Sequence, residues 1–203
     1  MWLRKTGRDT RRSTLTLGAA LALTAALALG GCSAAYVENS EASVLLQINS
    51  IHGGAQLDSD VRNGEFSSFV CENEVDVEVT VANKNPNSSA VPSSAVQLES
   101  YEIRYTRSDG RGTEGVDVPF RITGNLALTV SVGDDATFPL EVVRRQAKLD
   151  PPLTNINQTT ILTVSAQVTL YGKTISEKRV SASARFQIDF ADFGDTNESC
   201  PTN

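Results

Sequence analysis

The chain has 203 residues and a formal net charge of −6, with 18 lysines and arginines against 24 aspartates and glutamates. The first 31 residues hold five of the basic residues and one of the acids, so the other 172 carry 13 basic and 23 acidic side chains, a net charge of about −10. A domain of this size can form one hydrophobic core, and its acidity argues against binding nucleic acid or lying flat on an anionic membrane.

Residues 1–31 show the three zones of a secretory signal. Residues 1–13 are basic, residues 14–29 are apolar or small and uncharged, and Gly30 and Gly31 follow. This order predicts a signal peptide that is removed from the mature protein. The alternative is a permanent membrane-spanning helix, but such a helix needs about 20 predominantly apolar residues, and this stretch is shorter.

The motif Leu29-Gly30-Gly31-Cys32 resembles the lipobox of bacterial lipoproteins, in which a large apolar residue and two small ones precede a cysteine. The resemblance implies that Cys32 is lipidated and, after cleavage, becomes the N-terminus, with a further acyl chain on its amino group. Two or more acyl chains give a stable anchor. The alternative is ordinary cleavage after Gly31 that leaves Cys32 free. Residues 32–43 are then expected to be a lipidated tether.

Two features of the leader concern export and destination. Residues 10–15 contain Arg11-Arg12 and resemble a twin-arginine export signal, although Thr14 stands where that family usually has Phe. The alternative is that both arginines simply belong to the basic head. In lipoproteins of double-membraned bacteria, Asp after the lipidated cysteine commonly retains the protein at the inner membrane, and here that residue is Ser33. The resemblance therefore implies the cell envelope, at the outer membrane where the cell has one.

Residues 44–203 are predicted to form a single all-β domain. Several stretches alternate between apolar and polar residues, which is typical of strands with one buried face. Such strands favour antiparallel sheets, and about seven or eight of them predict a two-layer antiparallel β-sandwich of the immunoglobulin-like type. The predicted strands are Val44–Ile51 and residues 75–81, 96–106, 126–132, 162–170 and 180–190.

The connections are rich in turn-forming residues. Tyr171-Gly172-Lys173 is predicted to be a tight hairpin between the last two strands, and residues 108–112 and 132–135 are predicted to be turns. Residues 142–149 are predicted to form a short helix that Asp150-Pro151-Pro152 would end.

One segment resembles a known family beyond the leader. Residues 79–87 end a predicted strand in Asn85-Pro86-Asn87, and another predicted strand follows. This looks like the strand–NPN–strand core of the late-embryogenesis/WHy-type domains, which are immunoglobulin-like sandwiches. The resemblance covers about 30 residues, and Lys84 and residues 88–95 depart from the family spacing. It implies the fold more than a stress-related role.

Cys71 and Cys200 remain after Cys32 is assigned to the lipid. Disulfides persist in the compartments that exported proteins reach, so these two are predicted to pair. The loop that they close is long, and such a bond is worth about 4–5 kcal/mol less any strain. No Cys-x-x-Cys spacing indicates a redox or zinc motif.

Catalytic motifs are not evident. The single histidine, His52, stands beside Gly53-Gly54 and is expected at a strand end or on the surface, and no Gly-x-Ser-x-Gly or phosphate-binding loop appears. We therefore predict no catalytic residues and no cofactor. Acids cluster at Asp58/Asp60, at Asp134/Asp135 and at Asp189/Asp192/Asp195 with Glu198. Asp189, Asp192 and Asp195 are the only candidates for calcium, but they lack the EF-hand spacing, so no metal site is predicted.

The function expected from these features is a non-catalytic envelope module that binds an unidentified envelope protein or assembles into a larger complex. Edge strands of a sandwich accept partner strands, and loops carry most binding residues, here residues 53–69 and 85–95. One alternative is a small-molecule or hydrolytic site formed only in three dimensions, which a deep pocket with His52 or a carboxylate pair would favour. Another is calcium-dependent adhesion through the C-terminal acids.

Overall fold

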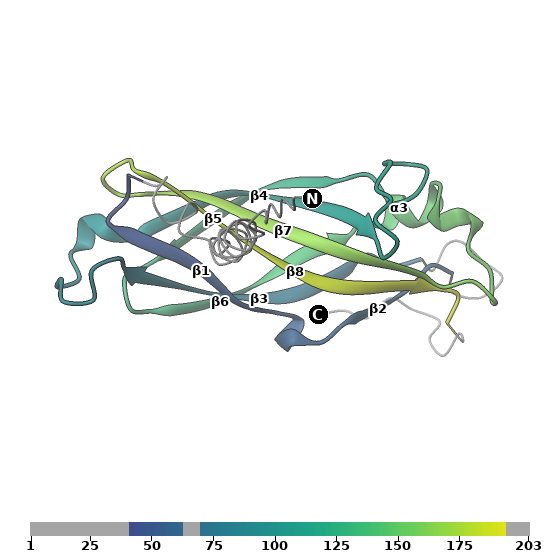
Figure 1. Cartoon of the computed structure of the whole chain (residues 1–203), viewed down its shortest axis with the longest axis horizontal. Helices are drawn as coiled ribbons and strands as arrows, with labels where there is room; N and C mark the ends of the chain where they lie inside the picture. Colours follow the sequence, from purple (N-terminus) through teal and green to yellow (C-terminus); the bar gives the residue numbers. More distant parts are fainter. Residues whose placement is uncertain (1–40, 63–69, 194–203) are drawn as a thin grey trace, which may run out of the picture. The chain divides into compact units, whose positions relative to one another are not determined.

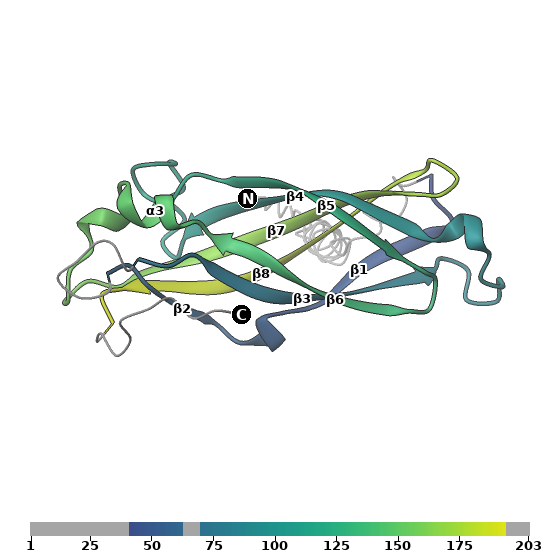
Figure 2. The same cartoon turned by 180° about the vertical axis from the view of Figure 1, so that it is seen from behind.

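The computed structural model describes residues 41–62 and 70–193. The chain divides into a unit of residues 1–39 and a unit of residues 40–203, and all described residues belong to the second. The predicted signal peptide and the lipobox with Cys32 lie outside the described residues. Within the described ranges the all-β prediction is confirmed, because eight strands form two sheets that pack as a sandwich (Figure 1, Figure 2).

The first sheet has three antiparallel strands in the order β1-β3-β6. They are β1 (Val44–Ile51), β3 (Asn73–Asn83) and β6 (Asp135–Val143). The alternation in β3 explains its place at the centre, because its four valines are buried and the residues between them are not. The outward positions of β3 carry Glu74, Asp76 and Glu78, so this face of the domain is acidic.

The second sheet has five strands in the order β2-β8-β7-β4-β5. They are β2 (Leu57–Asp60), β8 (Arg179–Ala191), β7 (Leu162–Thr174), β4 (Val96–Arg107) and β5 (Ile122–Val130). The arrangement of the two sheets corresponds to an immunoglobulin-like sandwich, in which strands A, B and E form one layer and strands G, F and C, with an added C′, form the other.

One pairing departs from the predicted antiparallel sheets: β2 runs parallel to β8. The reason is that no hairpin connects β2 to its neighbour. The chain leaves β1, passes through the short 3-10 helix η1 (His52–Gly54) and enters the other sheet as β2. A strand that reaches its sheet by such a switch keeps its direction instead of reversing.

Two other expectations about the strands are wrong. Tyr171-Gly172-Lys173 is not a hairpin, because β7 continues to Thr174 and the turn follows it, closed by a hydrogen bond from Thr174 N to Lys178 O. The position of Gly172 inside the strand requires glycine, because a Cβ there would overlap the carbonyl oxygen of Gln97 beside the bulge in β4. The strand β6 was not predicted, since Pro139 interrupts its pattern; an edge strand tolerates it.

The remaining connections agree better with the sequence. The predicted turns at 108–112 and 132–135 contain Gly110 and Gly133 at positive φ, and the predicted short helix is α3 (Arg145–Leu149). Two 3-10 turns, η3 (Pro92–Ser94) and η4 (Leu153–Asn155), complete the described connections.

The connections gather at two ends of the sandwich (Figure 1). We call the end where β1 begins the entry end; it includes residues 83–95, the turn 131–134 and the turn 174–178, at the left of Figure 1. We call the opposite end the α3 end; it includes residues 108–121 and 144–161 and the end of β2. Between the two ends, the apolar faces of both sheets form one core.

Candidate functional site

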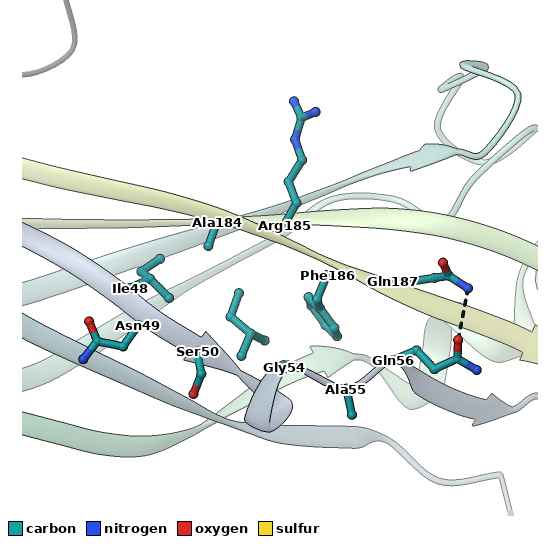
Figure 3. Close-up of a pocket in the computed structure, with 11 residues that line it drawn as sticks. Ile48, Asn49, Ser50, Gly54, Ala55, Gln56, Ala184, Arg185, Phe186 and Gln187 are labelled. Carbon is teal, nitrogen blue, oxygen red and sulfur yellow. Dashed lines mark hydrogen bonds between the residues drawn. The ribbon is translucent and has the colours of Figure 1, made fainter. Parts of the chain in front are cut away.

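A groove of about 410 Å³ lies between β1, η1 and β8 (Figure 3). Its floor is apolar and its rim carries amide and hydroxyl groups. The lining residues are Ile48, Asn49, Ser50, Ile51, Gly54, Ala55, Gln56, Ala184, Arg185, Phe186 and Gln187. Figure 3 shows Ile48 and Phe186 facing the space between the two strands, whereas Arg185 points away from it.

The sheet switch explains why the groove exists. A register shift between Ile48 and Ser50 interrupts the pairing of β1 with β3, and the chain then turns out of the sheet. His52, Gly53 and Gly54 follow with φ of 53°, 61° and 83°, a left-handed run in which glycine is unstrained and His52 is not. The parallel partner β2 covers β8 only from Ile188 onward. The core-facing Ala184 and Phe186 therefore stay half-buried.

Two hydrogen bonds hold polar side chains near the groove. Gln187 Nε2 donates to Gln56 Oε1 at 3.3 Å across its rim, and Arg185 donates to Gln167 Oε1 at 2.8 Å on the outer face of the sheet. Its lining contains no histidine, cysteine, lysine, aspartate or glutamate. The groups that line the groove can make contact with apolar side chains and exchange hydrogen bonds through their amides and hydroxyls.

A buried lysine lies at the α3 end. Lys148 is 3% exposed, and its Nζ donates to the backbone oxygen of Asp60 at 2.7 Å. Burial lowers the pKa of Lys148 to about 8, although the negative charges of Asp60 and Glu72 oppose this shift. The Asp60 carboxylate also accepts hydrogen bonds from the backbone N–H groups of Arg62 and Phe193, each at 3.2 Å. This polar cluster joins α3, the end of β2 and the end of β8.

The connection between β4 and β5 is ordered by ion pairs. Asp109 contacts Arg107 and Arg111 at 3.2 and 2.8 Å, and the hydrogen bonds from Arg111 lower the pKa of its carboxyl group. Within this connection Val116 and Phe120 are 69% and 59% exposed. The ring of Phe120 lies against Gly115, which leaves no room for a Cβ there. The connection thus exposes two apolar side chains close to a group of ion-paired charged residues.

The structure brings two of the acidic clusters that the sequence singled out together, because Asp58 lies opposite Asp189 in the β2–β8 ladder, and it separates the third cluster from them. Asp134 and Asp135 lie at the entry end, and Asp189 and Asp192 lie at the α3 end of β8, with Asp189 accepting a hydrogen bond from Gln187 Nε2 at 3.0 Å. Within the described ranges no three histidine, cysteine, aspartate or glutamate side chains are grouped as metal ligands. Asp195 and Glu198 lie outside the described residues.

The other predicted site residues are placed as follows. His52 starts η1 at the edge of the groove but does not line it. Cys71 comes two residues before β3; its predicted bond to Cys200 stays a prediction, because Cys200 lies outside the described residues. The predicted loop 53–69 is partly wrong, since it contains β2, but its residues 54–56 do line the groove. The sequence analysis did not identify Phe186 or Lys148 as candidate site residues, because no local sequence pattern distinguishes either from its neighbours.

Comparison with known proteins adds no family to this description. No protein-family model matches the chain, and no curated protein matches it. In the part of the chain that the structure describes, no helix is long and apolar enough to cross a membrane.

Proposed function

We propose that this chain is a lipoprotein of the bacterial cell envelope, anchored through a lipidated Cys32 and placed at the outer membrane where the cell has one. The zoned segment of residues 1–31 and the motif Leu29-Gly30-Gly31-Cys32 support the anchor. On this proposal the sandwich is a non-catalytic module, and it binds another protein of the envelope.

The observation that carries the binding role is the groove between β1 and β8. It offers half-buried apolar side chains, Ile48 and Phe186, beside a stretch of β8 that β2 does not cover and beside hydrogen-bonding amides. Protein interfaces concentrate their affinity in such partly formed pockets, where a partner's apolar anchor replaces water. The occupant that fits is an extended segment of a partner protein with one or two apolar side chains directed into the groove.

Recovery of the partner with the lipidated protein tests this proposal. Envelope membranes are solubilised, wild type and variants are captured, and the co-purifying proteins are quantified. Phe186→Ala should reduce recovery of a specific partner about tenfold, as expected for an interface anchor. The matched control is Phe120→Ala, which removes the same side chain from the α3 end, outside the groove.

Three results would contradict the proposal in different ways. Equal recovery with both variants would exclude the groove as the binding site. Retention of Cys32→Ala in the membrane after normal processing would exclude the lipid anchor. A substrate turnover that His52→Ala abolishes would replace the binding role with an enzymatic one.

A further inference from the structure

The entry end of the sandwich is a compact surface built by three segments. The turn after β7 lies against residues 93–95, because Ile175 N donates to Ala95 O at 3.0 Å and Ser176 N donates to Ser93 O at 3.2 Å. Lys84 N donates to Ser43 O at 2.9 Å, which places residues 83–95 beside the start of β1. The start of the described chain and both connections therefore form one surface.

Apolar side chains protrude from this surface. Val91 and Ile175 are 48% and 58% exposed, and they belong to the two connections that these backbone hydrogen bonds hold together. Neither side chain supports the core, which closes beneath them with the buried Ala95 and Val96. Both side chains are therefore accessible to an apolar phase outside the domain.

The entry end carries nearly balanced charges, whereas the outward face of β3 carries Glu74, Asp76 and Glu78. Three of the four lysines that follow Cys32 are found here, and Arg179 follows the last of them. The cations are Lys84, Lys173, Lys178 and Arg179, and the acids are Glu41, Glu99, Asp134, Asp135 and Glu177. The sum is about −1 out of about −10 for residues 32–203. The entry end is therefore close to neutral, and an anionic lipid surface repels it only weakly.

The length of chain before the sandwich restricts how far this end can be from Cys32. Eight residues, 33–40, separate Cys32 from Glu41. Fully extended, the nine Cα–Cα steps span at most about 32 Å. Glu41 pairs with Lys178 at 2.8 Å at the entry end, so on the proposed anchor this end is the part of the sandwich closest to Cys32 along the chain.

We infer that the entry end docks onto the lipid bilayer, with Val91 and Ile175 inserted at the headgroup level. This orientation rests on the lipid anchor proposed above. The sandwich then stands on its end, its acidic β1-β3-β6 face is held away from the lipid, and the α3 end with Phe120 points outward.

Tryptophan scanning of the full lipidated protein in vesicles of phosphatidylethanolamine and phosphatidylglycerol tests this orientation. The sequence contains one tryptophan, Trp2, in the segment predicted to be removed, so single substitutions report without background in the processed protein. The variants are Val91→Trp and Ile175→Trp, with Phe120→Trp as a control of similar exposure at the α3 end. Lipids brominated near the headgroup should quench the indole of either entry-end variant roughly two-fold more than the indole of the control, because interfacial side chains lie at that depth.

Vesicle flotation separates failure of the inference from failure of the anchor. Protein that floats with the vesicles but shows equal quenching in all three variants would overturn the docked orientation and leave the anchor intact. A blue-shifted emission without quenching by lipid would also overturn it, since another protein, or a second copy, would then cover these side chains. Processed protein that stays in the soluble fraction would refute the anchor and the orientation together.

Discussion

The entry end and the α3 end close the same sandwich by different means. Backbone geometry closes the entry end, with tight turns at 131–134 and 174–178 and a close approach of Gly172 to β4. Side chains close the α3 end, where Lys148 binds Asp60 and ion pairs order residues 107–121. We therefore expect steric substitutions to have the largest effect on stability at the entry end, whereas a change of protonation should affect stability at the α3 end.

The largest effect is expected from crowding at the entry end. Gly172→Ala places a Cβ against the Gln97 carbonyl and must displace the β4–β7 ladder, so the free energy of unfolding should fall by about 3 kcal/mol. The control is Gly133→Ala, where nothing lies within 4 Å but φ is +89°, and the cost should be about 1 kcal/mol. Chemical denaturation measures both; equal losses would show that close approach does not constrain this end.

The α3 end should instead respond to pH. The folded pKa of Lys148, about 8, lies below its unfolded value of 10.5, so between these values the unfolded chain binds more protons. The stability contributed at this site should therefore rise by about 2 kcal/mol from pH 8 to pH 10. Above pH 10 ionisation of tyrosines in the unfolded chain opposes the rise, because burial raises the pKa of Tyr101 and Tyr105 in the fold.

The variant Lys148→Met isolates this contribution, because it keeps the apolar stem and removes the titrating amine. Denaturation curves at pH 8, 9 and 10 should show the rise in wild type and not in the variant. Parallel pH profiles for the two proteins would mean that the buried amine does not control the pH response of the α3 end.

A smaller effect is expected where one hydroxyl joins the two sheets near the α3 end. Tyr105 donates to the carbonyl oxygen of Val142 at 2.7 Å, and Val142 lies in a register shift of the β3–β6 ladder. Tyr105→Phe leaves that carbonyl without this donor and should cost about 1 kcal/mol. Thermal unfolding of the variant checks this, and an unchanged midpoint would show that water replaces the hydroxyl.

The smallest effect is expected from the exposed ion pairs. Asp109→Asn removes the negative charge that pairs with Arg107 and Arg111, yet all three side chains are at least 38% exposed, so solvent screens the loss and the midpoint should hardly change. Faster amide exchange confined to residues 108–117 is the expected consequence. Unfolding at a clearly lower temperature would show instead that these pairs support the whole α3 end.

Most strands could be predicted from the sequence because each has one buried and one solvated face. The predicted bounds of β1 coincide with the observed Val44–Ile51, and the alternating valines identified β3. Glycine and proline were less reliable indicators of strand ends. Gly172 predicts a turn but lies within β7, and Pro139 interrupts the alternating pattern of β6, which was therefore not predicted. Both residues fit their strands for a tertiary reason: Gly172 leaves room for the backbone of β4, and Pro139 lies in the edge strand β6.

By itself, the sequence determined the fold class, the acidic balance of residues 32–203 and the signal-like zoning of residues 1–31, because composition and period-2 patterning are local properties. Only the tertiary structure decided which edges meet. The switch of the chain from β1 through η1 to β2 sets the parallel pairing with β8 and leaves Phe186 half-buried, although its place in the alternation is that of any core residue. Burial of Lys148 was equally invisible, because a lysine loses its water only when elements distant in sequence close over it.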